Sequence, residues 1–394
     1  MAKEAAGRAR PGRAPAPADR RGRPRQAEVA RLAGVSQATV SLVLSGRDIA
    51  TGRPISAPTR AKVLDAARSL GYVPDPAASR LAAARNNLLG VFSFTATFPT
   101  DVRHSYYPFL VGVEQEAAAQ GYDLVLFTGS STGGAGAGGT GALNRVRLAD
   151  GCLFLGRHAP SDELGRLVAD GFPVVHVGRH DEPEGLAWVG ADYVSASREV
   201  VTALAGLGHR RVLLVREDDD APASADRERG FLDGLAASGL PGGPDAVFRS
   251  GDPRRDLTAD RIWAWLADGV SAFVAEETDT GAAWRALCAA VDAAGLDCPG
   301  QVSLALLGSP PADLADGPVP MGFDIPRPAL GAEAVRLLAA RIGGGPAVGT
   351  LVACAFRPGT TAGPPATPEH TPVPTAPTPG PHTPVPTAPP EGAA

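Results

Sequence analysis

Apolar residues follow two different rhythms along this chain. Between residues 26 and 72 they recur at the spacing of one helix face, which predicts three short helices at 26–33, 36–45 and 57–71. From residue 88, apolar runs of four to six residues alternate with longer helical stretches. Strands that are apolar on both faces are typical of parallel sheets covered by helices. The sequence therefore predicts a small helical unit followed by α/β structure.

The α/β part covers some 270 residues, enough for one large or two small domains. The predicted strands are 88–94, 122–127, 151–156, 173–178, 210–215, 272–276 and 302–308. The predicted helices between them are 109–121, 195–208, 225–239, 257–269 and 280–295.

The two ends of the chain lack apolar periodicity. Residues 1–25 are rich in Arg, Pro, Gly and Ala, and the segment from Gly363 is rich in Pro, Thr and Ala, with HTPVPTAP at both 370–377 and 382–389. Such segments have no core to build, so both are predicted to be disordered tails. The sequence contains no run near the roughly 20 apolar residues of a membrane span and no secretory signal, which predicts a cytoplasmic protein.

Charge is distributed unevenly between the two parts. Residues 1–85 hold 16 Lys and Arg against 6 Asp and Glu, although the whole chain holds 37 against 42. The excess persists beyond the tail, with 8 basic against 4 acidic residues in 26–85. A basic head on an acidic body indicates that the head meets a polyanion.

The segment AGVSQATVSLVLSG, residues 33–46, has the features of a helix-turn-helix. Gly34 allows a turn with positive φ, Val35 fills the space beneath it, and Ser36 can cap the second helix. That helix places Val40, Val43 and Leu44 on the face that would pack against the first helix, at Val29, Ala30 and Ala33.

The opposite face carries short and polar residues, listed as Gln37, Ala38, Ser41, Leu42 and Ser45. A helix so slim fits deeply into a DNA major groove, where Gln can read adenine and hydroxyls can hold phosphates. The alternative is a small helical bundle that binds no DNA.

These segments also resemble a known family. The run AEVARLAGVSQATVSLVLSG, then ISAPTRAKVLDAARSLGYVPDPAASRLAAARNNLLGVF, is similar to the headpiece and hinge of LacI-family (lactose/galactose repressor) transcription regulators. DGCLFLG, PVVHVGR, ALAGLGHRRVLLV, DRERGFLDGL and FRPGTTAG follow in family order, so the resemblance covers about 26–362. It implies a two-lobed core like a periplasmic binding protein.

The resemblance assigns roles by position. Gln37, Ala38 and Leu42 would read bases, whereas Ser36, Ser41, Ser45 and Thr59 would touch the DNA backbone. In the hinge, Leu81 would wedge into the minor groove, flanked by Ala78 and Ala82. The residues that would line the effector cleft are Tyr106, Tyr107, Asp192, Arg227 and Glu277.

Several segments depart from the family pattern. Leu42 stands where many members have Arg, and the segment RDIATGRP, residues 47–54, is longer than usual and adds Arg47 and Arg53. Glu276-Glu277 replaces a typical Asn-Asp pair, and LLGSPP replaces a glycine-phenylalanine-aspartate signature. The last two changes fall around the cleft, so a sugar is only one candidate effector.

Other motifs in the sequence give weaker evidence of a functional site. The glycines of 134–139 satisfy GxGxxG but favour a flexible loop, Glu217–Asp220 favours a solvated loop, and His176 with His180 lacks helical metal-ligand geometry. The cysteines, Cys152, Cys288, Cys298 and Cys354, form no CxxC pair and are interpreted as small buried hydrophobes. No nucleophile, metal or cofactor motif points to an enzyme.

The predicted protein is a homodimeric repressor that binds double-stranded operator DNA and a small-molecule effector. Its predicted parts are a basic tail (1–25), a helix-turn-helix headpiece (26–73), a hinge helix (74–85), a two-lobed core for effector binding and dimerisation (86–362) and a Pro-rich tail (363–394). The alternative is a cytosolic solute-binding sensor with a degenerate headpiece.

Overall fold

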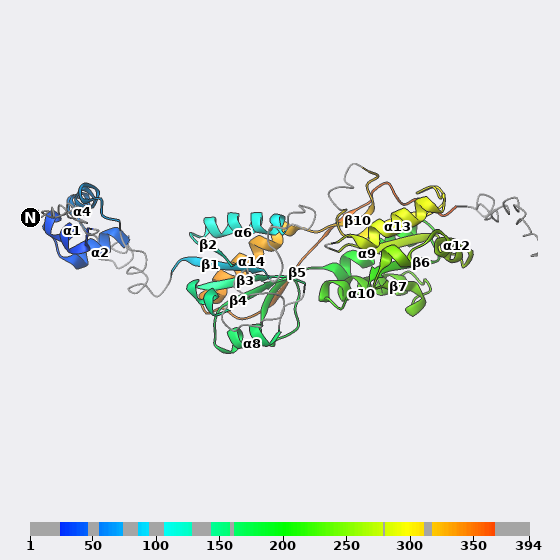
Figure 1. The fold of residues 1–394 in the computed structure, drawn as a ribbon, viewed down its shortest axis with the longest axis horizontal. Coiled ribbons are helices and arrows are strands. Elements are labelled where there is room, and N and C mark those ends of the chain that lie inside the picture. The colour runs from blue at the N-terminus through cyan, green and yellow to red at the C-terminus, as the bar shows by residue number, and fades with distance from the viewer. Residues whose placement is uncertain are drawn as a thin grey trace, which may run out of the picture. The chain divides into compact units, whose positions relative to one another are not determined.

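The computed structural model describes residues 24–45, 55–73, 86–93, 106–127, 143–157, 161–278, 280–310 and 317–366. The chain divides into two compact units, Met1–Asn86 and Asn87–Ala394, which are considered separately below. We call the described part of the first unit the headpiece and that of the second the core (Figure 1).

The headpiece contains α1 (Gln26–Ala33), α2 (Gln37–Ser45) and α4 (Ala57–Leu70), which confirms the three predicted helices. Gly34 ends α1 with φ 66° and Gly71 ends α4 with φ 63°, so both glycines occupy the left-handed region expected for them. The buried residues that hold the helices together are Val29, Ala30, Val40, Val43, Val63, Ala66 and Ala67. The predicted packing face of α2 is therefore confirmed.

The core contains two six-stranded sheets. The sheet of the N-terminal lobe has the order β11-β5-β4-β3-β1-β2, and that of the C-terminal lobe has the order β12-β10-β9-β8-β6-β7. Neighbouring strands are parallel except for the antiparallel pair β10 and β12. This arrangement confirms the predicted two-lobed α/β core of parallel sheets.

The strands of the N-terminal lobe are β1 (Leu88–Ser93), β2 (Asp123–Phe127), β3 (Gly151–Leu155), β4 (Val174–Val177), β5 (Ala187–Ala191) and β11 (Gly349–Val352). Those of the C-terminal lobe are β6 (Val212–Glu217), β7 (Val247–Ser250), β8 (Ala272–Glu276), β9 (Ser303–Leu307), β10 (Met321–Asp324) and β12 (Ala355–Arg357). The seven predicted strands are all present, whereas β5, β7 and β10 to β12 were not predicted.

The N-terminal lobe has the helices α6 (Tyr107–Ala119), α8 (Ser161–Ala169) and α14 (Arg327–Ile342), with a 3₁₀ turn at Arg145–Leu148. The C-terminal lobe has α9 (Tyr193–Gly206), α10 (Pro222–Ala237), α11 (Pro253–Asp256), α12 (Ala259–Ala267) and α13 (Ala282–Ala293), with a 3₁₀ turn at Pro244–Ala246. The five predicted core helices are confirmed, whereas α8, α11 and α14 were missed.

The chain passes between the lobes more than once. It leaves the N-terminal lobe after β5, returns from β10 to α14 and crosses again between β11 and β12. Both lobes therefore combine segments that are far apart in the sequence. As a result, side chains of distant segments meet where the lobes face one another.

A close helix crossing holds α14 on α6. A Cβ atom added at Gly112 would lie 1.8 Å from the carbonyl oxygen of Pro328, and one at Gly331 would lie 2.1 Å from that of Phe109. Only residues without a side chain allow the two backbones to approach so closely. The crossing anchors the returning helix beside β3, β4 and β5.

Candidate functional site

The exposed face of α2 carries the residues predicted to meet DNA. Ser36, Gln37, Ala38 and Ser41 are exposed, while Leu42 is half-buried. Ser36 confirms the predicted cap, because its Oγ accepts a hydrogen bond of 3.1 Å from the backbone N–H of Thr39. The α2 face is thus presented to solvent on a helix whose other face is fixed in the core of the headpiece.

Thr59, the remaining predicted backbone contact of the headpiece, lies in the first turn of α4. It is half-buried, and its hydroxyl lies 2.8 Å from Ser56 Oγ. Ser56 caps α4, because its Oγ accepts a hydrogen bond from the Thr59 N–H at 3.4 Å. The helix start is therefore held by a local pair of hydroxyls.

The described headpiece is basic. It carries the cations Arg25, Arg31, Arg60, Lys62 and Arg68 against Glu28 and Asp65. Arg68 pairs with Asp65 at 2.6 Å, but both side chains are largely exposed. Several of the residues singled out by the sequence lie outside the described residues. They are Arg47 and Arg53, the predicted hinge contacts Ala78, Leu81 and Ala82, the glycine run 134–139 and the side chain of Ser45.

A cleft of about 850 Å³, including the part open to solvent, lies where the two lobes meet. Tyr106, Arg227 and Glu277 line it, in agreement with their predicted place. Asp192 instead caps α9, accepting from the Ser195 N–H at 3.0 Å, and Tyr107 is 63% exposed; neither lines the cleft. Arg157, Arg179 and Arg327 line it as well and were not predicted.

Arg227 lies on α10 and is 3% exposed. Its Nε donates to the carbonyl of Leu307 at 2.8 Å, and its guanidinium lies 3.8 Å from the ring centroid of Tyr193. The planar fork of Arg suits such combined stacking and hydrogen bonding. The sequence predicted this Arg from its place in RERGF, and the structure fixes its orientation.

Glu277 bridges two guanidiniums. Its Oε2 accepts from Arg227 Nη2 at 3.3 Å and its Oε1 from Arg327 Nη2 at 2.5 Å, so the carboxylate ties α10 to α14. The backbone beside it requires Gly308, which has φ 146° and whose missing Cβ would lie 2.5 Å from Glu277 Oε2. The two departures from the family pattern, at 276–277 and in LLGSPP, are therefore in contact.

Two further ion pairs join the lobes across the cleft. Arg157, after β3, donates to Asp219 at 2.6 Å and to Ser224 at 3.0 Å. Arg179, after β4, donates to Asp226 at 2.7 Å and also to the exposed Asp181. Each pair links an N-terminal-lobe guanidinium to a C-terminal-lobe carboxylate.

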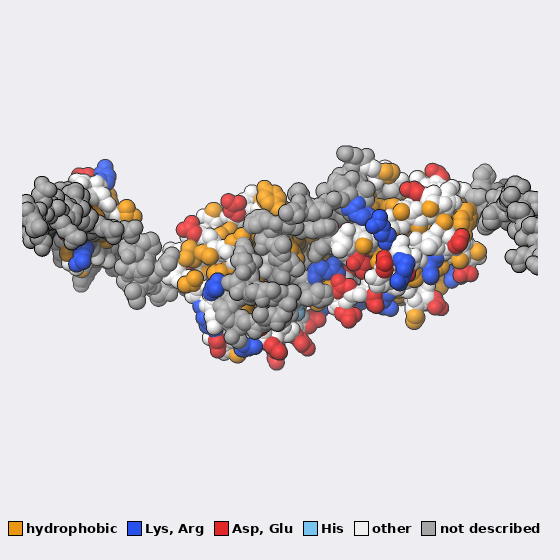
Figure 2. Space-filling model, in the orientation of Figure 1, with side chains coloured by type: hydrophobic (Ala, Val, Ile, Leu, Met, Phe, Trp, Pro, Cys, Tyr) orange, Lys and Arg blue, Asp and Glu red, His pale blue; other side chains and the backbone are white. Residues whose placement is uncertain are grey.

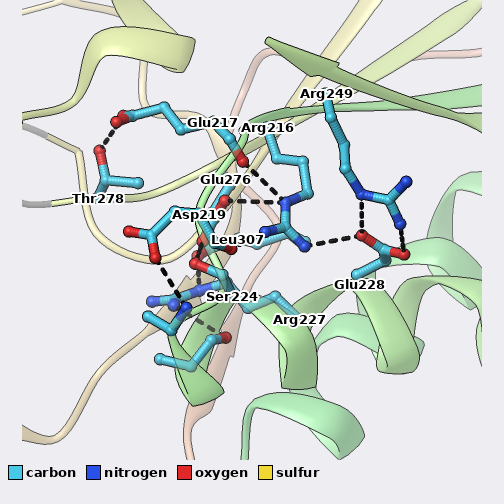
Figure 3. Close-up of polar contacts among 12 residues, drawn as sticks. Arg216, Glu217, Asp219, Ser224, Arg227, Glu228, Arg249, Glu276, Thr278 and Leu307 are labelled. Atoms are coloured by element: carbon cyan, nitrogen blue, oxygen red, sulfur yellow. Dashed lines mark hydrogen bonds and ion pairs between the residues drawn. The ribbon is translucent and has the colours of Figure 1, made fainter. Parts of the chain in front are cut away.

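The interpretation of Glu217–Asp220 as a solvated loop is wrong for two of its four residues. Glu217 accepts from Thr278 at 2.5 Å (Figure 3). Asp219 pairs with Arg157, whereas Asp218 and Asp220 are exposed. The loop is partly buried because Thr278, which follows β8, and Arg157 of the opposite lobe bind it. Periodicity within one segment does not reveal such contacts.

Beneath this loop lies a buried carboxylate. Glu276 is 1% exposed and accepts a hydrogen bond from Ser224, and burial raises its pKa above the usual range. Arg216 lies 3.7 Å away and pairs with Glu228 at 2.7 Å, and Arg249 pairs with the same Glu228 (Figure 3). The network supports the C-terminal wall of the cleft. Figure 2 shows how acidic and basic side chains alternate over the C-terminal lobe.

His176 at the end of β4 lines the cleft and is 1% exposed. Burial lowers its pKa to about 4, so the ring is neutral at pH 7. Its Nδ1 lies 2.9 Å from the Gly178 carbonyl, which can only accept, so Nδ1 carries the proton. Within the described residues Nε2 has no hydrogen-bond partner.

The described residues contain no His, Cys, Asp or Glu group arranged to hold a metal ion. All four cysteines are free thiols; Cys152 is buried, and the others are partly buried, less than predicted. Across the described ranges no helix is both long and apolar enough to cross a membrane.

Comparison with known families matches both units. Residues 27–75 match the model of bacterial regulatory proteins of the lacI family, and residues 201–358 match a periplasmic binding protein-like domain. A lacI-type helix-turn-helix headpiece followed by a periplasmic binding protein-like core places the chain in the class of bacterial regulatory proteins.

Curated relatives specify the family. The maltose regulon regulatory protein MalI of Escherichia coli is 30% identical over 264 residues, which are 66% of this chain and 74% of that protein. The regulator CelR of Thermobifida fusca is 31% identical over 225 residues, 56% of this chain but only 64% of CelR, less than two thirds of its length. The chain belongs to the LacI family, as its sequence motifs predicted.

Solved structures share the fold. The transcriptional regulator CelR in complex with cellobiose has a TM-score of 0.56 at 25% identity, over 86% of this chain and 100% of that one. The lac repressor dimer bound to operator and the anti-inducer ONPF has a TM-score of 0.63 at 18% identity, over 85% and 98%. At 18% identity the second match concerns the fold alone.

Proposed function

We propose that this chain is a transcriptional regulator that binds double-stranded operator DNA as a homodimer and responds to a small molecule bound in the cleft of its core. It works in the cytoplasm and has no enzymatic activity of its own. Gln37, Ala38 and Leu42 read base edges, while Ser36, Ser41, Ser45 and Thr59 hold the backbone. Ala78, Leu81 and Ala82 of the hinge enter the minor groove.

The observation that carries the proposal is the division of α2 into two faces. Val40 and Val43 are buried in the headpiece, whereas Gln37, Ala38 and Ser41 are exposed, and the described headpiece carries five cations against two anions. A helix with short exposed side chains approaches the groove floor closely, and the surrounding cations hold phosphates. The division explains why this segment tolerates Ser, Thr and Val, which are moderate helix formers.

The cleft supports the second half of the proposal. Side chains of both lobes line it, so a bound molecule would favour one relative position of the lobes. The transcriptional regulator CelR, whose structure is 25% identical to this chain, was solved in complex with cellobiose. A 100-fold change in operator affinity requires a coupling free energy of about 2.7 kcal/mol.

Selection of bound sequences from a random double-stranded DNA pool by the full-length protein tests the DNA-binding half. We expect a two-fold symmetric motif, and a plot of log affinity against log salt with a slope of roughly −5 to −7 if about six to eight phosphates are contacted. A slope near zero would refute DNA binding. If no sequence is enriched, the result would favour the alternative function, a solute-binding sensor. In that case Leu42, in place of Arg, would have removed the sequence specificity of the headpiece.

A matched pair of variants separates recognition from folding. Ser41→Ala removes an exposed hydroxyl from the α2 face and should weaken binding to the selected operator several-fold. Ser69→Ala makes the same change at an exposed position of α4, where the hydroxyl only donates to the Ala66 carbonyl. If both variants bind the operator with equal affinity, Ser41 does not contact the DNA.

A further inference from the structure

The lining of the core cleft has an unbalanced charge. Four guanidiniums line it, those of Arg157, Arg179, Arg227 and Arg327, against two carboxylates, those of Asp226 and Glu277. Asp219 and Asp181 pair with two of these cations from the margin, and the Asp181 side chain is 66% exposed. Because exposed pairs are screened by water, Asp181 compensates Arg179 only weakly.

Both cleft carboxylates are already engaged. Glu277 accepts from Arg227 and Arg327 through different oxygens, and Asp226 accepts from Arg179. Each carboxylate oxygen can still accept a second hydrogen bond, but the negative charge of both groups is already offset by a guanidinium. The cleft carboxylates therefore oppose an anionic ligand less than unpaired carboxylates would.

The guanidiniums of the cleft, in contrast, still have N–H donors that a ligand could use. Each guanidinium has five N–H donors in a fixed fork. Within the described residues Arg179 Nη2, Arg327 Nε, and Arg157 Nε and Nη1 have no hydrogen-bond partner. These donors come from three separate elements that line one cavity.

His176 adds an independent observation. Its Nδ1 lies against the Gly178 carbonyl, and its buried Nε2 makes no hydrogen bond within the described residues, although the Gly156 carbonyl also lies near the ring. Buried polar atoms without a partner are rare unless a ligand or water completes them. A ligand hydroxyl is the donor that a neutral imidazole nitrogen accepts.

From this arrangement we infer that the effector is a hydroxylated small molecule that bears an anionic group, a phosphate or a carboxylate. The anion is held by the cleft guanidiniums and a hydroxyl donates to His176 Nε2. Charge-assisted hydrogen bonds between guanidinium and an oxyanion are about twice as strong as those between neutral groups. The inference rests on the proposed role of the cleft as an effector site, and it specifies the ligand class.

Binding of matched sugars to the full-length protein tests the inference by titration calorimetry. The probes are glucose, galactose and ribose. Each is compared with the derivative that carries a phosphate on its terminal carbon and with the derivative that carries a carboxylate there. Inorganic phosphate alone is tested as well. At least one anionic member should bind about tenfold or more tightly than its neutral parent. Preference for the phosphates or for the carboxylates identifies which anion the cleft takes.

Variants locate the anion. Arg327→Gln and Arg179→Gln should each reduce the affinity for the anionic probe about tenfold, whereas Arg327→Lys, which keeps the charge, should retain more of it. Arg255→Gln is the control, because Arg255 pairs with Asp256 outside the cleft. Circular dichroism establishes that each variant is folded.

Three results would overturn the inference. The first is a neutral sugar that binds as tightly as its anionic counterpart, and the second is the absence of binding by every anionic probe. The third is binding of inorganic phosphate alone that the cleft variants do not change, which means an adventitious ion only. Selection of DNA without ligand is a separate measurement, so failure of DNA binding leaves this result interpretable.

Discussion

The α2 face and the core cleft present their chemistry in opposite ways. On α2, Gln37 and Ser41 are exposed, and all members of the face come from one continuous segment. In the cleft, Arg227 is 3% exposed and contacts Glu277 and Tyr193, which lie on other elements. The comparison teaches that an exposed polar face can be built from one continuous segment, whereas an enclosed charged cleft requires distant segments to meet.

The largest expected effect tests how strongly the core depends on close long-range contacts. Gly112→Ala places a Cβ atom 1.8 Å from the Pro328 carbonyl oxygen, so α6 and α14 must separate. We expect a loss of about 3 kcal/mol in the free energy of unfolding of the core. Denaturant unfolding followed by tryptophan fluorescence measures it, since all four tryptophans follow residue 87.

The control for this substitution is Gly206→Ala at the end of α9, where an added Cβ meets no atom within 4 Å. It should leave the core unchanged or stabilise it by a few tenths of a kcal/mol. Similar losses for both variants would mean that the crossing is less tight than the structure shows.

Acid should destabilise the core through His176. Its pKa is about 4 in the folded protein and 6.5 ordinarily, so the unfolded chain binds the proton more readily. The stability is complete above pH 6.5 and falls towards pH 4, by up to about 3 kcal/mol. Unfolding free energies measured at pH 7, 6, 5 and 4.5 should decrease in this order.

His176→Gln isolates this contribution. His209 acts in the same direction, because burial lowers its pKa, whereas the raised pKa of Glu276 acts in the opposite direction. The variant should therefore show a flatter pH dependence than the original chain. An unchanged slope would assign the acid sensitivity to other groups.

Ion pairs of the two regions should differ in strength. Asp226, whose side chain is 9% exposed, pairs with Arg179, whereas Asp65, 69% exposed, pairs with Arg68. Asp226→Asn should cost the core about 1–2 kcal/mol, because it leaves Arg179 less compensated. Asp65→Asn should cost the headpiece at most about 0.5 kcal/mol. Tryptophan fluorescence reports the first, and hydrogen exchange of the 57–70 peptides reports the second; equal costs would contradict the comparison.

A smaller effect is expected from a local cap. Ser56→Ala removes the acceptor for the Thr59 N–H and should destabilise the start of α4 by about 1 kcal/mol. Faster hydrogen exchange confined to residues 57–70, with unchanged tryptophan fluorescence, is the expected result. Ser69→Ala is the matched control, and spread of the effect into the core would show that the cap acts beyond its helix.

The sequence determined the headpiece well, because its signals are local. Ser36 and Ser56 cap helices through neighbouring N–H groups, and Gly34 and Gly71 end them with positive φ. Strands with continuous apolar runs, such as β3 and β8, were also predicted. By contrast, β11 and β12 were missed, because they are short, partly exposed and lack a continuous apolar run.

The cleft depended on the tertiary structure. The sequence singled out Arg227 and Glu277, but nothing local gave a cleft role to Arg157, Arg327 or Arg179, although Arg179 ends the family motif PVVHVGR. These three come together because the chain crosses between the lobes and returns through α14. Periodicity reports which face of an element is buried, and only packing decides which charged side chains then meet.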